Sequence, residues 1–292
     1  MERARDEDAK GSTCENPSGF EFISVSHVLM LQVHKTTAIS LYQNSRLSTV
    51  KMQEEKHLLS YPSDATPHMT LTRRGPIFLL RMRNNENRLS DAFIKGIHQC
   101  LQVVEDAYEN EGPCEMALVT TGEGKFYSNG LDMSVFEVPN FVQTVFYKLL
   151  RRMLIFPIPT IAVLNGHTFA GGCLLALAHD YRVMRKDRGF MCMNELDISL
   201  PLIPGLAAVV RVKTTPQVYR DVCLQAKRYP ADVALQSGLV DEVGTEDELL
   251  NKGLALAQKW APKAKSPVYG SIKQNMYWEA LLHLEPEEQA KL

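Results

Sequence analysis

Hydrophobic and polar residues follow a regular pattern only from about residue 75 onward. Short apolar runs of the kind typical of strands occupy residues 76–83, 116–121 and 160–164. Between these runs, apolar residues recur at three- and four-residue spacing, which is the period of a helix with one buried face. Strands that alternate with helices predict an α/β layered fold.

The first predicted helix carries clear signals at both of its ends. Ser90 is suited to cap it, apolar residues line one face over residues 93–104, and Gly112 with Pro113 ends it. Residues 172–179 are almost wholly apolar, which predicts a buried helix. Two further strands are expected at residues 181–184 and 190–193, and further helices at residues 140–154, 206–212, 216–225, 231–237, 246–260 and 268–282.

The first part of the chain shows no sustained period of either kind. We therefore expect a poorly ordered N-terminal extension without chemistry over residues 1–74, with a presequence or a docking segment as the alternative. The acidic residues Glu2 and Asp6 disfavour a transit peptide. The core is expected at residues 75–265, followed by a C-terminal helix and targeting tail at residues 266–292.

Composition and charge narrow the functional class. The 292 residues are 45% hydrophobic and 23% charged, with a formal net charge of −2, which argues against a protein that binds nucleic acid through the phosphate backbone. The longest nearly apolar stretch, residues 153–164, is too short to span a bilayer, so no membrane span is expected. The six cysteines are scattered without metal-ligand spacing, which predicts free thiols and no metal site.

Motifs of three large enzyme classes are absent from the sequence. It contains no phosphate-binding loop of the G-x-x-x-x-G-K-[ST] type, no H-E-x-x-H pair and no G-x-S-x-G elbow. Chemistry that depends on ATP, on hydrolytic zinc or on a serine nucleophile is therefore disfavoured.

Two glycine-containing loops each follow a predicted strand and end at or near a helix start, at residues 126–132 and 165–173. Glycine tolerates the backbone angles that expose N–H groups, and a helix N-terminus adds a favourable dipole. Such loops are suited to bind negative charge. Each loop taken alone is also explained by an ordinary structural turn.

The residues of these loops and their order along the chain resemble the sequence motifs of the crotonase superfamily, which contains the enoyl-CoA hydratases and isomerases. Residues 130–132, Gly-Leu-Asp, resemble that family's Gly-x-Asp segment. The segments that resemble its central signature are residues 159–166, 170–173 and 179–182. The resemblance covers residues 74–277 and implies a crotonase-like ββα spiral core, followed by a helical C-terminal region.

The resemblance implies that Leu131 and Gly171 present their backbone N–H groups as an oxyanion hole. The ligand would be the thioester carbonyl of an acyl-CoA, and each preorganised donor contributes about 3 to 4 kcal/mol to a developing negative charge. Ser128, Asn129 and Gly130 would line the substrate site. A core leucine and a packing glycine explain Leu131 and Gly171 equally well without the resemblance.

Proton transfer is assigned by the resemblance to a single glutamate. Hydratases of this family use two glutamates, and this chain has Leu174 at the first position but keeps Glu195, next to Asn194, at the second. One carboxylate suffices to move a proton from C2 to C4 of a 3-enoyl thioester. The pattern is similar to the Δ3,Δ2-enoyl-CoA isomerases, so Glu195 is expected to be the base, with Leu174 and Asn194 beside the substrate. Asp197 is the competing carboxylate.

Other polar residues have weaker claims to a role in the site. The phosphates of CoA need cations, and Lys273 matches a lysine position that the family uses, with Lys125 as a second candidate. His167 lies in the second glycine loop, where local hydrogen bonds explain it as well. The side chains of His179 and Asp180 diverge on a helix, which disfavours a catalytic pair.

The function implied by the resemblance is a Δ3,Δ2-enoyl-CoA isomerase of fatty-acid β-oxidation, without a cofactor beyond the CoA of its substrate and assembled as a homotrimer or hexamer. Hydration, thioester hydrolysis or silent acyl-CoA binding are the alternatives. The sequence ends in Ala290, Lys291 and Leu292, a variant of the S-K-L address that a peroxisomal import receptor reads. We therefore expect a peroxisomal location.

Overall fold

The structure is a computed structural model that describes residues 54–63 and 66–285. Its larger sheet has seven strands in the order β1-β2-β3-β4-β6-β8-β10, antiparallel from β1 to β3 and parallel from β3 onward. These strands are β1 (Lys56–Tyr61), β2 (Met69–Arg74), β3 (Ile77–Met82), β4 (Ala117–Gly122), β6 (Thr160–Leu164), β8 (Tyr181–Arg185) and β10 (Glu242–Gly244).

A smaller parallel sheet has three short strands in the order β5-β7-β9. They are β5 (Phe126–Ser128), β7 (His167–Phe169) and β9 (Met191–Cys192). The helices are α2 (Asp91–Glu111), α3 (Tyr147–Leu154), α4 (Gly171–Leu177), α5 (Pro204–Lys213), α6 (Pro216–Gln225), α7 (Ala231–Gln236), α8 (Glu246–Trp260), α9 (Tyr269–Met276) and α10 (Trp278–His283), with short helical segments η1 (Met133–Glu137), η2 (Val142–Phe146) and η3 (Ala261–Lys265).

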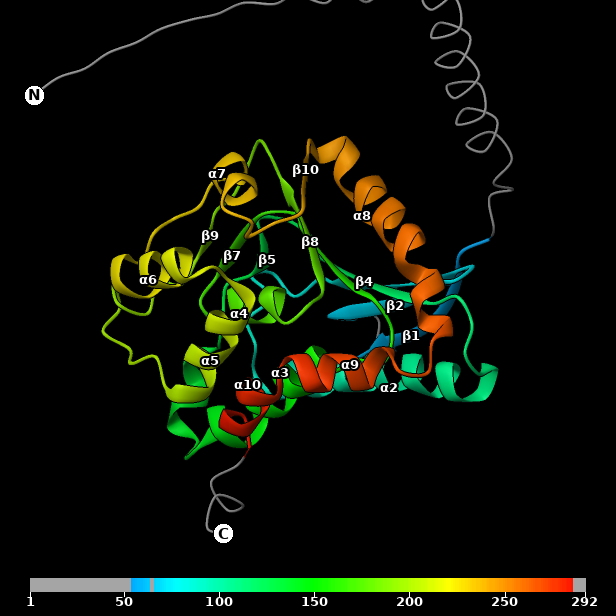
Figure 1. Cartoon of the computed structure of the whole chain (residues 1–292), viewed down its shortest axis with the longest axis horizontal. Coiled ribbons are helices and arrows are strands. Elements are labelled where there is room, and N and C mark those ends of the chain that lie inside the picture. Colours follow the sequence, from blue (N-terminus) through cyan, green and yellow to red (C-terminus); the bar gives the residue numbers. More distant parts are fainter. Residues whose placement is uncertain (1–53, 64–65, 286–292) are drawn as a thin grey trace, which may run out of the picture. The chain divides into compact units, whose positions relative to one another are not determined.

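The chain repeats one unit three times, and this repetition builds both sheets. In each unit, one strand joins the larger sheet, the next joins the smaller sheet, and one or more helices follow: β4-β5-α3, β6-β7-α4 and β8-β9-α5. The expected ββα spiral core is therefore confirmed, and helices make up most of the chain after β10 (Figure 1).

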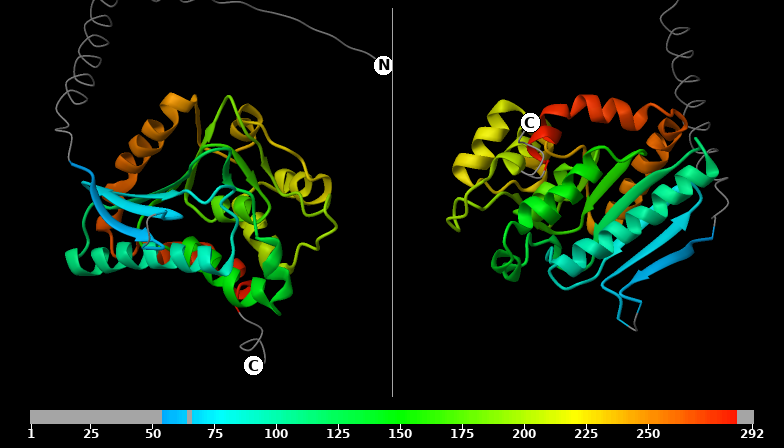
Figure 2. Two further views of the ribbon diagram at one scale, coloured as in Figure 1. Left: turned by 180° about the vertical axis from the view of Figure 1, so that it is seen from behind. Right: turned by 90° about the horizontal axis from the view of Figure 1, so that it is seen from below.

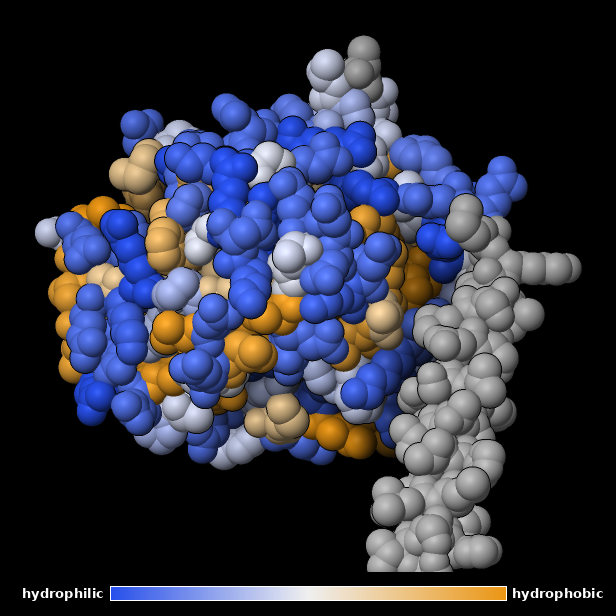
Figure 3. Space-filling model, turned by 90° about the horizontal axis from the view of Figure 1, so that it is seen from above, coloured by the Kyte–Doolittle hydropathy of each residue, from blue (hydrophilic) through white to orange (hydrophobic). Residues whose placement is uncertain are grey.

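Both faces of the larger sheet are covered, which explains its nearly continuous apolar strands. Side chains alternate between the faces, so that Leu79 and Val119 pack with α8 while Leu80 and Leu118 belong to the main core on the other side. The helix α2 runs beside the N-terminal strands, as Figure 2 shows. Its N-cap is Ser90, as predicted, with the Phe93 N–H donating to the serine hydroxyl. Seen from above, the surface is largely hydrophilic (Figure 3).

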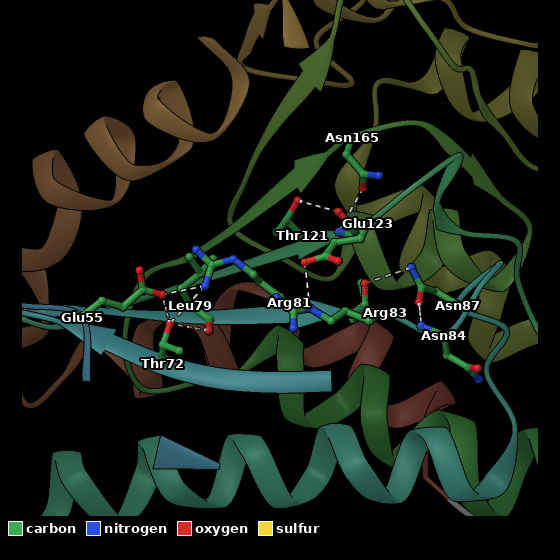
Figure 4. A network of polar contacts seen from close by, with 12 residues as sticks. Glu55, Thr72, Leu79, Arg81, Arg83, Asn84, Asn87, Thr121, Glu123 and Asn165 are labelled. Atoms are coloured by element: carbon green, nitrogen blue, oxygen red, sulfur yellow. Dashed lines mark hydrogen bonds and ion pairs between the residues drawn. The ribbon is translucent and has the colours of Figure 1, made fainter. Parts of the chain in front are cut away.

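The predicted boundary of the core at residue 75 is wrong, because residues 56–61 and 69–74 form β1 and β2 of the larger sheet. Their pattern is obscured by polar side chains that have partners in the fold. Thr72 donates to Glu55 over 2.6 Å, and Arg81 of β3 donates to the same carboxylate over 2.6 Å (Figure 4). The expectation for residues 1–53 lies outside the described residues.

Smaller differences from the predicted elements have local causes. Strand β7 lies within the expected loop 165–171. It was not predicted because three residues are too few to show a strand pattern, and its pairing with β5 and β9 depends on the fold. The expected helix at 268–282 is divided at Tyr277 into α9 and α10. The targeting tail at residues 286–292 lies outside the described residues.

Candidate active site

Three loops meet at one edge of the smaller sheet. They follow β5, β7 and β9, and they carry Leu131, Gly171 and Glu195 respectively. Because the three strands are parallel, their carboxyl ends lie at the same edge, where ligands bind in many α/β proteins. All three residues line one cavity of about 470 Å³. Residues far apart in the sequence are thus brought together by the spiral.

The backbone of Gly171 lies close to the backbone nitrogen of Leu131. Leu131 forms a parallel bridge with Leu89, in which the Leu89 N–H donates to the Gly130 carbonyl over 2.8 Å and the Asp132 N–H donates to the Leu89 carbonyl over 3.3 Å. The N–H of Leu131 itself therefore faces the opposite side. A Cβ atom added to Gly171 would lie 3.3 Å from the Leu131 nitrogen. Gly171 begins α4, whose first N–H groups lack partners within the helix.

Glycine at position 172 allows the two loops to come this close. A Cβ atom there would lie 2.4 Å from the carbonyl oxygen of Ser128, well inside van der Waals contact. At Gly130, the backbone angle φ of +82° lies in the left-handed region that favours glycine. Main-chain contact between the loops fixes the separation of the two N–H groups.

Glu195 lines this cavity, and one of its carboxyl oxygens has no hydrogen-bond partner among the described residues. Its Oε2 atom is buried and, among the described residues, has no hydrogen-bond partner, and the same holds for Oδ1 of Asn194. Burial raises the pKa of Glu195 to about 7, with its own backbone N–H opposing the shift. A hydrogen bond of 2.9 Å from the Leu200 N–H to the Glu195 carbonyl holds the loop in place.

The remaining wall of the cavity is mainly apolar. Leu174 of α4 and Phe146 of η2 are fully buried and line it next to the loops. Asn129 and Asn194 line it as predicted. Asp197, the competing carboxylate, is exposed and does not line the cavity. Glu195 is thus the one carboxylate in the cavity wall that the described residues form.

The sequence pattern does not identify Arg88, a cationic residue of the cavity wall. Its Nε donates to Glu86 over 2.7 Å and its Nη1 donates to the Leu131 carbonyl over 3.5 Å. Asn129 donates to the same Glu86 carboxylate over 3.0 Å. Arg88 lies just before the cap of α2, and no periodic pattern marks it, because its position depends on how α2 meets the loop after β5.

Three predicted substrate-binding residues, Ser128, Gly130 and Lys273, do not line the cavity, and these expectations are corrected. Lys273 is buried, with its ammonium 2.9 Å from Asp180 and donating to the Phe156 carbonyl over 3.1 Å. Desolvation lowers the pKa of Lys273, and Asp180 opposes this. Ser128 is fully buried and donates to the Asn87 carbonyl over 2.7 Å, which ties β5 to the turn after β3. Both side chains hold the scaffold together.

His179, His167 and Lys125 lie outside the cavity wall and contact only the scaffold. His179 is buried, with Nε2 2.9 Å from the Thr120 hydroxyl and Nδ1 2.8 Å from the Leu175 carbonyl, and burial lowers its pKa to about 3. His167 lies among the rings of three phenylalanines, outside the cavity wall, and its buried Nδ1 has no hydrogen-bond partner among the described residues, contrary to the expected local hydrogen bonds. Lys125 lies over the Phe126 ring, also outside the cavity wall.

The sequence predicts no metal site, no membrane-spanning helix and no disulfide bond. Within residues 54–63 and 66–285, no three His, Cys, Asp or Glu side chains form a group that could hold a metal ion. No helix in the described part of the chain has the length and apolar character to cross a membrane. The five described cysteines are free, as predicted, while Cys14 lies outside the described residues.

Comparison with known proteins gives consistent matches. The family model described as enoyl-CoA hydratase/isomerase matches residues 73–288. A relative from Arabidopsis thaliana, named enoyl-CoA delta isomerase 1, peroxisomal, is 33% identical over 73% of this chain and 91% of its own. A second, enoyl-CoA delta isomerase 2, peroxisomal, is 35% identical over 72% and 92%. A solved enoyl-CoA hydratase/isomerase family protein from Pseudomonas syringae has the same fold, with a TM-score of 0.68 at 20% identity over 77% of this chain and 98% of that one.

Proposed function

Because this chain belongs to the enoyl-CoA hydratase/isomerase family, we propose that it is a Δ3,Δ2-enoyl-CoA isomerase. It would convert 3-enoyl-CoA into 2-trans-enoyl-CoA, the form that β-oxidation of unsaturated fatty acids requires. One observation carries the proposal. A single carboxylate, Glu195, lines an apolar cavity together with Leu131, Gly171 and Leu174.

In the proposed reaction, the thioester carbonyl accepts hydrogen bonds from the N–H groups of Leu131 and Gly171. Glu195 removes a proton from C2, and the electron pair of the broken C–H bond moves into a dienolate whose charge lies on the thioester oxygen. The same carboxyl returns the proton to C4, and the double bond then lies between C2 and C3. The reaction is balanced without water, oxidant or reductant.

The surroundings of Glu195 suit both halves of this transfer. A pKa of about 7 makes the carboxylate a competent base and its protonated form a competent acid near neutral pH. The apolar side chain of Leu174 keeps the wall free of competing hydrogen bonds to the carboxylate. Addition of water needs a second group that activates or holds the water, and a leucine supplies neither function.

Arg88 is proposed to bind the nucleotide part of the substrate in place of Lys273. It is the cation in the cavity wall that the described residues form, and Glu86 orients it. A guanidinium suits phosphate recognition because its donors match the spacing of two phosphate oxygens. We expect Arg88→Gln to raise KM for enoyl-CoA several-fold and to leave KM for the matching N-acetylcysteamine thioester unchanged.

A peroxisomal location and a trimeric or hexameric assembly are also proposed. The two relatives from Arabidopsis thaliana that are named peroxisomal support the location. A fluorescent protein fused to the N-terminus should follow a peroxisomal marker, and deletion of residues 290–292 should disperse it. Light scattering of the purified protein would measure the mass of the assembly.

The decisive experiment offers the purified chain 3-hexenoyl-CoA and 2-hexenoyl-CoA in parallel. Rapid conversion of the first into the second supports the isomerase. Conversion of 2-hexenoyl-CoA into 3-hydroxyhexanoyl-CoA as the faster reaction would favour a hydratase, and release of free CoA would favour a thioesterase. Binding without any reaction, and without deuterium exchange at C2 or C4, would indicate a silent acyl-CoA-binding protein.

A further inference from the structure

Most of the exposed large apolar side chains of the described residues lie in two places. One group lies on α9 and α10 and includes Ile272 and Trp278. The other lies on η1 and on the loop after β9, where Met133, Phe136 and Ile198 are 63%, 44% and 47% exposed. These three side chains also line the cavity that contains Glu195. The second group is therefore an apolar rim that continues the wall of the candidate active site to the surface.

The fold holds these side chains outward. The neighbouring residue Val135 is buried and anchors η1 in the core, while Asp132 caps η1 through a 3.0 Å hydrogen bond from the Ser134 N–H. With Val135 inside, Met133 and Phe136 stay exposed on the same short helix. The rim is thus part of the fixed structure of the cavity mouth.

The wall of the cavity has a polar, cationic part and an apolar part. Arg88 and Asn129, both bonded to Glu86, supply polar and cationic groups suited to the anionic part of CoA. Met133, Phe136 and Ile198 offer only apolar surface. A cavity of about 470 Å³ is at the small end of the range for ligand sites, so a substrate with many methylenes must extend beyond it.

We propose that Met133, Phe136 and Ile198 bind the distal methylenes of long acyl chains and so make this enzyme prefer long over short 3-enoyl-CoA esters. The inference rests on the proposed function, since it assigns the occupant of the rim by continuity with the proposed reaction site. Each methylene that the rim removes from water raises affinity about fourfold. Chain length beyond the reacting carbons therefore controls KM.

The test compares kcat/KM for 3-dodecenoyl-CoA and 3-hexenoyl-CoA. We expect the wild-type protein to favour the longer substrate at least about tenfold, which corresponds to the burial of two or more methylenes. Phe136→Ser and Ile198→Ser should each lower this ratio about fivefold, mainly through KM for the longer substrate. Equal ratios in the wild type and in both variants would overturn the inference.

Matched controls come from exposed apolar residues next to the rim. Val138 and Leu196 are 52% and 56% exposed and do not line the cavity, so Val138→Ser and Leu196→Ser should leave the ratio within about twofold. Leu196 instead lines a separate cavity of about 180 Å³, whose wall also includes Glu195. If Leu196→Ser lowers the ratio and the rim variants do not, the acyl tail enters that cavity and the inference is wrong.

A further outcome separates this inference from the proposed function. If the wild type isomerises neither substrate, the proposed function fails, and dissociation constants for saturated dodecanoyl-CoA and hexanoyl-CoA still test the rim in the same variants. If Phe136→Ser lowers the mass of the assembly and slows both substrates equally, the rim covers a second copy of the chain and the inference is overturned.

Discussion

Glu195 and Asp180 are two partly buried carboxylates, and they differ in their partners. Asp180 lies against Lys273 at 2.9 Å, and it accepts hydrogen bonds from the Thr160 N–H over 2.9 Å and from the Tyr269 hydroxyl over 3.2 Å. Glu195 has an oxygen without a partner in the described part of the chain, and its pKa is raised to about 7. A satisfied carboxylate stabilises the fold, whereas an unsatisfied one in a cavity is available for chemistry.

The contrast between Asp180 and Glu195 also shows why residue types in a sequence do not by themselves identify a reactive group. Asp180 follows His179 in the sequence and lies near Lys273, three residue types that recur in active sites. In the structure, each of the three is bonded to the scaffold. Glu195 stands between Asn194 and Leu196 and has no obvious partner in the sequence. The group with the fewest bonds is the one placed to react.

Removal of the Glu195 carboxylate should have the largest effect. Because no second carboxylate lines the described cavity, Glu195→Gln should lower kcat for 3-hexenoyl-CoA at least about 10³-fold. The amide has nearly the same size, so binding of saturated hexanoyl-CoA should change little. Asp197→Asn is the matched control, since Asp197 is exposed two residues away, and it should retain normal turnover. Near-normal turnover of Glu195→Gln would remove Glu195 from the mechanism.

Breaking the Asp180 pair should instead destabilise the protein. Lys273→Met leaves a buried carboxylate without its cation, which costs about 3 to 5 kcal/mol and lowers Tm by about 10 °C. Activity of the folded protein, measured well below Tm, should stay within about threefold of normal. Lys263→Met changes an exposed lysine and should leave Tm unchanged. An increased KM for enoyl-CoA with an unchanged Tm would show that Lys273 binds phosphate after all.

Much of the fold could be predicted from the chain, and the failures have a common cause. Helices with capped ends and a buried face, such as α2 and α8, have local signals, and α8 spans the predicted residues. Strand β2 carries Thr70 and Thr72, polar residues that are buried between the neighbouring strands, and Thr72 donates a hydrogen bond to Glu55. Strands β5 and β7 have three residues each and are held by pairing, β5 with β7 and β7 also with β9. Such pairing is tertiary information that no local period contains.

Part of the candidate site could be predicted from the sequence, but not all of its residues and not their arrangement. The loops with Leu131, Gly171 and Glu195 were recognised by their resemblance to a family, and the structure shows that they line one cavity. Lys273 was assigned to phosphate from its sequence position, yet its burial against Asp180 depends on how α9 packs. Arg88 had no sequence signal, because it lines the cavity through the contact of its loop with β5.

The buried carboxyl group of Glu195, one oxygen of which has no partner, should also affect the free energy of unfolding. Its pKa is about 7 in the folded protein and 4.5 in the unfolded chain, so the folded state binds the proton more tightly. The cost of ionising the buried group therefore grows as pH rises from 4.5 to 7 and is fully present above pH 7. Glu195→Gln removes this cost and should stabilise the protein at pH 8 by up to about 3 kcal/mol. Denaturant unfolding should show a gain that shrinks toward pH 5, and an equal gain at both values would contradict the raised pKa.

The smallest expected effect is the pH dependence of the reaction. A base with a pKa of about 7 is mostly ionised at pH 8 and mostly protonated at pH 6, so kcat/KM should fall about tenfold between these values. A carboxylate with an ordinary pKa would give a flat profile over the same range. Leu174→Asn places an amide beside the carboxylate, and its hydrogen bond to the charged form should lower the apparent pKa. A midpoint that stays at pH 7 in this variant would mean that Leu174 does not desolvate Glu195, and the contrast with the well-bonded Asp180 would then need another cause.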